Sequence, residues 1–173
     1  LPCFSWLYPH ELPASFTQLS SLEELNLAVR LQQLPEAFEN LTNLRRLTRS
    51  RCPELTHLPA SLLQLSLLER LVISGCHHRF SPPEIIGQMS ALTHLDVSNL
   101  RRLPTSIGQL QQLQSLTLSG YGYLDWLPDC LSQLHALKTL ALFRCERLSS
   151  LPAGIGNLTS LEELAFESTQ KSP

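Results

Sequence analysis

Apolar residues recur along this chain in one pattern that is copied every 21 to 24 residues, and a Leu-Pro dipeptide opens most copies. The copies start at positions 12, 34, 58, 82, 103, 127 and 151, so successive starts lie 22, 24, 24, 21, 24 and 24 residues apart. Pro82-Pro83 opens the fourth copy in place of Leu-Pro. Repetition at this period predicts a solenoid, in which each copy buries its apolar face only against its neighbours.

Two spacings within each copy predict its local structure, counting the opening residue as position 0. In the copy over 127–150, positions 4, 7 and 10 are apolar, a spacing near three that is typical of a 3₁₀ or short helical turn. Position 1 is Pro, which the first turn of a helix tolerates. Positions 13 and 15 are apolar too, and this alternation predicts a short strand with one buried face. Each copy should therefore be a strand, a turn and a short helical return, with the strands stacked into a parallel sheet.

The cysteines also follow the repeat. Cys52, Cys76 and Cys145 all stand at position 18 of their copies, where we expect them to point inward and serve the carbonyls and amides of the turn. The total of five cysteines is odd, which argues against a simple disulfide framework. Free cysteines favour a reducing compartment, so the expected localisation is cytoplasmic.

The pattern resembles the leucine-rich repeat, whose consensus L-x-x-L-x-L-x-x-[N/C]-x-L fits residues 68–76, and the match extends from Leu12 to the end. The segments LPAGIGNLTSLEEL (151–164) and LVISGC (71–76) are similar to repeats of plant intracellular nucleotide-binding leucine-rich repeat (NLR) disease-resistance receptors. This resemblance implies an α/β solenoid, a horseshoe with a parallel β-sheet on its concave face and short helical or 3₁₀ turns on its convex face. We expect about seven repeats over 12–173, preceded by a capping segment or repeat remnant over 1–11.

Positions 12, 14 and 16 of each copy should face outward on the concave side. The best candidates for contacting a partner are the charged and aromatic residues Arg46, Arg70, His94, Asp96 and Phe143, because arginine beside an exposed aromatic is typical of binding surfaces. Two further arginines, Arg45 and Arg51, extend the basic patch sideways. The alternative is a solvated sheet face whose charges only maintain solubility. If the arginines bind, the partner should be acidic and its affinity should fall with salt.

Arg49 interrupts the apolar pattern because it occupies position 15, where every other copy has Leu, Ile, Val or Phe. A charge directed into the core must find a partner or extend toward solvent. We expect either a local shift of strand register or an arginine that hydrogen-bonds to turn carbonyls. We predict that Arg49→Leu is neutral or stabilising.

Other features of the sequence argue against several classes of function. The formal net charge of -2 disfavours nucleic acid as a partner, and no apolar run is long enough to span a membrane. Cys76, His77 and His78, with Cys52 one copy earlier, match no zinc spacing, so no metal site is predicted. No catalytic constellation or phosphate-binding loop occurs, so we expect neither enzyme activity nor a cofactor.

Two further predictions concern the aromatic residues of one long turn and the ends of the sequence. Tyr121, Tyr123 and Trp126 should pack the long turn before Leu127 rather than stack on a ligand. Because the chain begins with Leu1 and its end shows no convincing cap, we expect it to belong to a longer protein.

The resemblance implies a non-enzymatic protein–protein interaction module, the ligand-sensing and autoinhibitory region of an intracellular immune receptor. Its partner would be a pathogen effector, a guarded host protein or the receptor's own nucleotide-binding domain. Two alternatives remain open, a substrate-recognition arm of a bacterial effector ubiquitin ligase and a signalling adaptor. The sequences that flank this chain in its gene would separate these possibilities.

Overall fold

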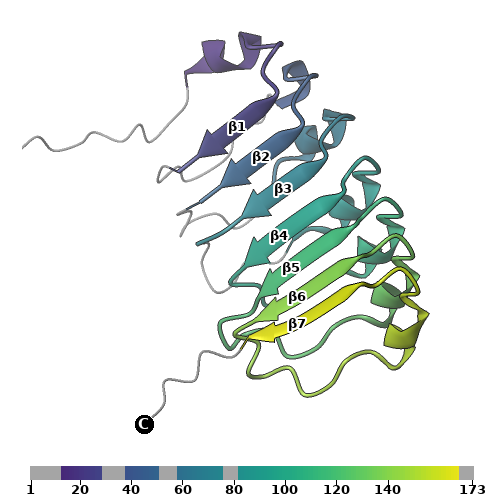
Figure 1. Cartoon of the computed structure of the whole chain (residues 1–173). Coiled ribbons are helices and arrows are strands. Elements are labelled where there is room, and N and C mark those ends of the chain that lie inside the picture. The colour runs from purple at the N-terminus through teal and green to yellow at the C-terminus, as the bar shows by residue number, and fades with distance from the viewer. Residues whose placement is uncertain (1–12, 29–37, 51–57, 76–81, 168–173) are drawn as a thin grey trace, which may run out of the picture.

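The computed structural model describes residues 13–28, 38–50, 58–75 and 82–167. Seven strands lie side by side in one parallel sheet, in the order in which they occur along the chain (Figure 1). The strands are β1 (Glu24–Leu27), β2 (Arg46–Arg49), β3 (Arg70–Ile73), β4 (His94–Ser98), β5 (Ser115–Ser119), β6 (Thr139–Phe143) and β7 (Glu163–Glu167). The α/β solenoid with a parallel sheet is thereby confirmed.

A short 3₁₀ turn precedes each strand, and these turns stack along one side of the sheet (Figure 1). They are η1 (Ala14–Gln18), η2 (Phe38–Asn40), η3 (Ala60–Gln64), η4 (Glu84–Gln88), η5 (Thr105–Gln109), η6 (Asp129–Gln133) and η7 (Ala153–Asn157). None of the helices in the described ranges is long and apolar enough to cross a lipid bilayer.

Proline lies just before the 3₁₀ turns, one position earlier than the sequence predicts. In six of the turns it precedes the first helical residue, as Pro104 does before η5, and its carbonyl accepts the N–H of the residue three positions later. The Ile107 N–H, for example, donates to the Pro104 carbonyl at 3.2 Å. The fixed φ of proline thus sets the entry into each turn without the residue being part of it.

The core is a stack of leucines held in register by the sheet. Leu71 pairs with Leu95 in the next strand, and the position-13 leucines continue this row through all seven strands. In the second to sixth copies the side chains at positions 10, 13 and 15 are buried, and the burial of positions 13 and 15 is what the alternation predicts. In β7 the inward side chains Leu164 and Phe166 are exposed instead.

Several predictions fall on residues outside the described ranges. These are the N-terminal segment 1–11, the second Leu-Pro dipeptide at 34–35, the candidate Arg51, and the group Cys52, Cys76, His77 and His78.

Candidate functional site

The side of the sheet away from the 3₁₀ turns, the open face, carries the candidate binding residues in rows fixed by the strand register. One row runs across the strands through Glu24, Arg46, Arg70, His94, Ser115, Thr139 and Glu163. A second runs through Asn26, Thr48, Val72, Asp96, Thr117, Ala141 and Ala165. Of the predicted candidates, the register therefore places Arg46, Arg70 and His94 next to one another, and Asp96 beside them.

Arg70, His94 and Asp96 surround a shallow depression of about 30 Å³ on β3, β4 and β5. The hydroxyl-bearing residues Ser115 and Thr117 complete its polar lining. Among the residues that the structure describes, Arg70 makes no ion pair, so its guanidinium can donate hydrogen bonds to a carboxylate of a partner. The depression therefore combines a cation, a carboxylate and two hydroxyl groups within one small area.

The His94 ring is oriented by its neighbour in sequence. The Thr93 hydroxyl donates to the Glu69 carbonyl at 2.9 Å, and the same hydroxyl oxygen lies 2.9 Å from His94 Nδ1. Because the hydroxyl has only one proton, Nδ1 must be the donor in this second contact. Burial, reinforced by the Arg70 charge, lowers the pKa of His94, which favours a neutral ring whose Nε2 accepts a hydrogen bond. Thr93 thus holds the imidazole.

The Asp96 carboxyl is partly buried in the second row. Burial raises its pKa, and the nearby positive charge of Arg70 offsets part of that rise. The Val72 and Thr117 positions flank Asp96 in the register, so an apolar side chain and a hydroxyl border it. A hydrogen-bond donor on a partner would therefore stabilise this partly buried carboxylate.

The other two described arginines of the predicted patch are engaged by glutamates. Arg46 Nη1 lies 3.6 Å from Glu24 on the neighbouring strand, and Arg45 hydrogen-bonds to Glu69. The Arg46–Glu24 pair is exposed and the Arg45–Glu69 pair is half-buried, so both contribute little to stability, but they neutralise much of the charge that a partner would meet. The sequence did not reveal the role of Glu69, because it lies one residue before β3 rather than on the open face.

Phe143 does not lie next to the arginines, which corrects the prediction of an arginine cluster beside an exposed aromatic. It lies at the end of β6, opposite Ser119 of β5 and Glu167 of β7. Three strand spacings separate β6 from β3, which is about 14 Å across the sheet. Phe143 and Arg70 can therefore contact the same partner only if that partner spans several strands.

Arg49 is fully buried, and the sheet register is regular around it. It pairs with Leu27 and Ile73 in the adjacent strands, so the expected alternative of a register shift is wrong. Its Nη1 lies 3.5 Å from the Leu27 carbonyl, in agreement with the alternative in which arginine bonds to a backbone carbonyl.

The turns after β5 and β6 differ in how well the sequence predicted them. The Cys145 thiol donates to the Phe143 carbonyl at 3.3 Å, which confirms the inward position expected for it. The expected packing of Tyr121, Tyr123 and Trp126 is found only in part: the three side chains are 40–46% exposed, and the Arg144 guanidinium lies 4.9 Å from the centre of the Tyr121 ring.

The repeat geometry and the sequence comparison agree on the class of protein. A family model described as a leucine-rich repeat region matches residues 84–173. The chain therefore belongs to the leucine-rich repeat family. A search of curated protein sequences found no match.

Solved structures with similar folds come from different biological settings. The leucine-rich repeat domain of the type III effector XopL is 30% identical with a TM-score of 0.70, over 90% of this chain and 64% of that one. A leucine-rich repeat protein of Leptospira interrogans is 26% identical with a TM-score of 0.60, over 94% of this chain and 53% of that one. The ectodomain of the Arabidopsis thaliana receptor kinase GASSHO1/SCHENGEN3, in complex with CASPARIAN STRIP INTEGRITY FACTOR 2, is 24% identical with a TM-score of 0.67, over 89% of this chain and 19% of that one.

This chain spans less than two thirds of each of these three structures. The leucine-rich repeat fold is a protein–protein interaction scaffold, because stacked repeats present a long rigid surface for binding.

Proposed function

We propose that the open face binds a protein partner through the depression at Arg70, His94 and Asp96, as the ligand-sensing region of an intracellular immune receptor. The observation that carries the binding proposal is the position of Arg70. Its exposed guanidinium borders a depression lined by His94, Asp96 and two hydroxyl groups, while the neighbouring Arg46 is already paired with Glu24.

The partner should present a carboxylate to Arg70 and a hydrogen-bond donor to Asp96. Both groups lie on rigid strands whose register fixes their separation, so little side-chain or backbone order is lost on binding. Because Arg70 is exposed, its contribution should weaken as the ionic strength rises. The cytoplasmic setting and the immune-receptor role rest on the similarity of the LPAGIGNLTSLEEL and LVISGC segments to plant intracellular receptors.

Affinity capture from a plant-cell lysate, followed by mass spectrometry, tests the open face directly. Arg70→Glu should abolish capture of a protein that wild type retains. Arg101→Glu makes the same charge change at an exposed position after β4, away from the open face, and should leave capture unchanged. Phe143→Ala, run separately, reports whether the partner reaches β6. Equal capture by wild type and Arg70→Glu would place binding elsewhere.

A second candidate is supported by the similarity to XopL. The 30% identity to the leucine-rich repeat domain of a type III effector favours a recognition arm of a bacterial effector, such as a ubiquitin ligase. The two candidates differ in the coding sequence on either side of this chain. A P-loop nucleotide-binding domain upstream would support the receptor, and a Cys-x-Asp catalytic domain downstream would support the effector ligase.

A further inference from the structure

Two hydrogen-bond acceptors face the depression on the open face from the same strand. His94 and Asp96 are alternate residues of β4, so their side chains lie on one face of the sheet, and both line the depression. The His94 ring presents a lone pair at Nε2, because Nδ1 carries the proton that it donates to the Thr93 hydroxyl. Ionised Asp96 presents only acceptor oxygens. A group that enters the depression should therefore donate hydrogen bonds to both.

A cation borders these two acceptors and restricts the charge of that group. Arg70, on the adjacent strand, pairs with His94 in the register. Burial lowers the pKa of the imidazole, and the charge of Arg70 lowers it further, so the field of the guanidinium reaches the ring. A second cation in the depression would be repelled in the same way. The entering group should accordingly be a neutral donor.

The size of the depression and its number of acceptors narrow the choice of donor. A volume of about 30 Å³ admits one small polar group. A hydroxyl group has one proton and can serve only one of the two acceptors. A primary amide, the side-chain group of Asn and Gln, has two protons on its nitrogen and an acceptor oxygen. The hydroxyl groups of Ser115 and Thr117 line the same space and can donate to that oxygen.

We propose that the depression recognises the side-chain amide of an Asn or Gln in the partner protein. The amide nitrogen donates to His94 Nε2 and to the Asp96 carboxylate, and the amide oxygen accepts from a hydroxyl group of β5. This inference rests on the proposed function, in which an acidic residue of the same partner meets Arg70. A carboxylate in the depression itself would face the Asp96 carboxylate and the His94 lone pair, so Asp should be rejected where Asn is accepted.

Thr93 makes this selection possible, although it does not line the depression. Its hydroxyl fixes the proton on Nδ1 of His94 and leaves Nε2 as an acceptor. Without that hydroxyl the ring can carry its proton on Nε2, where it would donate to a carboxylate. Thr93 is therefore a positioning residue for the choice between Asn and Asp.

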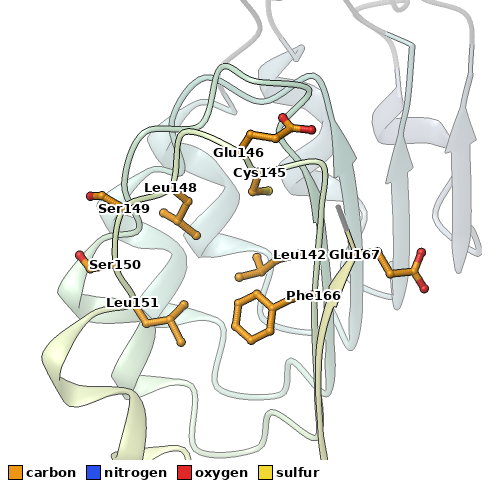
Figure 2. Close-up of a pocket in the computed structure, with 9 residues that line it drawn as sticks. All are labelled: Leu142, Cys145, Glu146, Leu148, Ser149, Ser150, Leu151, Phe166 and Glu167. Atoms are coloured by element: carbon orange, nitrogen blue, oxygen red, sulfur yellow. The ribbon is translucent and has the colours of Figure 1, made fainter. Parts of the chain in front are cut away.

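Another hollow in the described ranges offers a contrasting set of groups. It lies beside β7 with a volume of about 310 Å³, and Leu148 and Leu151 face Leu142 and Phe166 across it (Figure 2). An amide placed among these apolar side chains loses its hydrogen bonds to water, whereas an aliphatic side chain gains from the contact. Amide and aliphatic probes should therefore separate the two sites.

Four short peptides, titrated into the isotope-labelled chain and followed by NMR, test the selection. The first, acetyl-Gly-Asp-Gly-Asn-Gly-N-methylamide, has its acidic and amide side chains at alternate positions, which share one face of an extended segment. It should shift the amide signals of β3, β4 and β5. The second peptide has Asp in place of Asn and the third has Leu there, and both should bind about tenfold more weakly. The fourth has Ser in place of the first Asp and tests the carboxylate that the proposed function assigns to Arg70.

Two protein variants assign the selection to Thr93. Thr93→Val removes the hydroxyl, and should reduce the preference for the Asn peptide over the Asp peptide from about tenfold to less than about twofold. In the same variant, the nitrogen chemical shifts of the His94 ring should report that Nδ1 has lost its proton. Thr139→Val makes the same change on β6, outside the depression, and should keep both the preference and the His94 shifts.

The outcomes separate this inference from the proposed function. Equal binding of the Asn, Asp and Leu peptides, an unprotonated Nδ1 in wild type, or shifts centred on 142–151 and 166 would overturn the amide assignment. Equal binding of the first and fourth peptides would remove the carboxylate contact at Arg70, while a preference for Asn over Asp would still support the amide. Absence of shifts with all four peptides at millimolar concentration would overturn both.

Discussion

The Glu84 carboxylate accepts a hydrogen bond from the Ser106 backbone N–H at 2.8 Å, and so joins two consecutive turns of the solenoid. The Thr105 N–H donates to the same carboxylate at 3.2 Å. Both N–H groups begin η5, where a helical turn cannot supply them with partners of its own. A side chain of one repeat thus caps the next, and the hydrogen bond from Ser106 is the main reason why the pKa of Glu84 lies below its ordinary value.

Removal of this cap should destabilise the protein in a pH-dependent way. We expect Glu84→Ala to lower the free energy of unfolding by about 1 kcal/mol at neutral pH. Because the folded-state pKa is lowered, the contribution is complete above the ordinary glutamate pKa and is lost as the pH falls through the folded value. Urea unfolding of wild type and variant at several pH values measures the difference. A difference that persists unchanged at strongly acidic pH would contradict the assignment, and Glu23→Ala serves as an exposed control.

Asp96 should show the opposite dependence on pH. Burial raises its pKa, so the folded state favours the protonated carboxyl and loses stability as the pH rises from the ordinary aspartate value through the raised one. Asp96→Asn removes this titration. At neutral pH we expect the free energy of unfolding of the variant to exceed that of wild type by no more than about 1 kcal/mol. Urea unfolding across the acidic range checks both statements, and a clear loss of stability at pH 7 would show that the ionised carboxylate is needed.

A glycine that recurs at position 5 of three copies should tolerate substitution at only one of them. A Cβ on Gly108 would lie 2.7 Å from the Cys130 carbonyl oxygen of the next turn, closer than real contacts allow. The equivalent Gly156, in the last turn, would place its Cβ more than 4 Å from any such neighbour. We expect Gly108→Ala to cost about 1–3 kcal/mol and Gly156→Ala to be neutral or slightly stabilising. Thermal melting of the two variants compares the same change in two settings, and equal effects would contradict the packing argument.

The repeat predicted the fold well because each copy specifies the same local geometry. The alternation at positions 13 and 15 is enough to fix which strand face is buried, and parallel stacking then aligns Arg70 with His94. The sequence could not show which charges are already neutralised. That depends on contacts between copies, such as Arg46 with Glu24, which the pattern of a single copy does not contain.

The distance between candidates could have been inferred from the order of the copies, since Arg70 belongs to the third copy and Phe143 to the sixth. Phe143 and Arg70 occupy the outward faces of equivalent strands, but their separation depends on how many strands lie between them. Phe166 of β7 fills position 15 like Leu142 of β6, yet Phe166 is exposed and Leu142 is buried, a difference that the repeat pattern does not contain. Repeat patterns describe what each copy buries against its neighbours, so they predict the interior of the stack of repeats better than its ends.

Arg49 provides the sharpest test of how the core tolerates charge. It is fully buried between Leu27 and Ile73 in the register, and its Nη1 lies 3.5 Å from the Leu27 carbonyl, which also accepts the Ser50 N–H. Desolvation of a guanidinium costs several kcal/mol, which hydrogen bonds to backbone carbonyls offset only in part. We therefore expect Arg49→Leu to leave the free energy of unfolding unchanged or to raise it by up to about 2 kcal/mol. Arg46→Leu makes the same substitution on the exposed face of the same strand, and should change stability by no more than about 0.5 kcal/mol. Chemical unfolding of the two variants decides the matter, because a loss of more than about 1 kcal/mol in Arg49→Leu alone would mean that specific hydrogen bonds hold the guanidinium in the core.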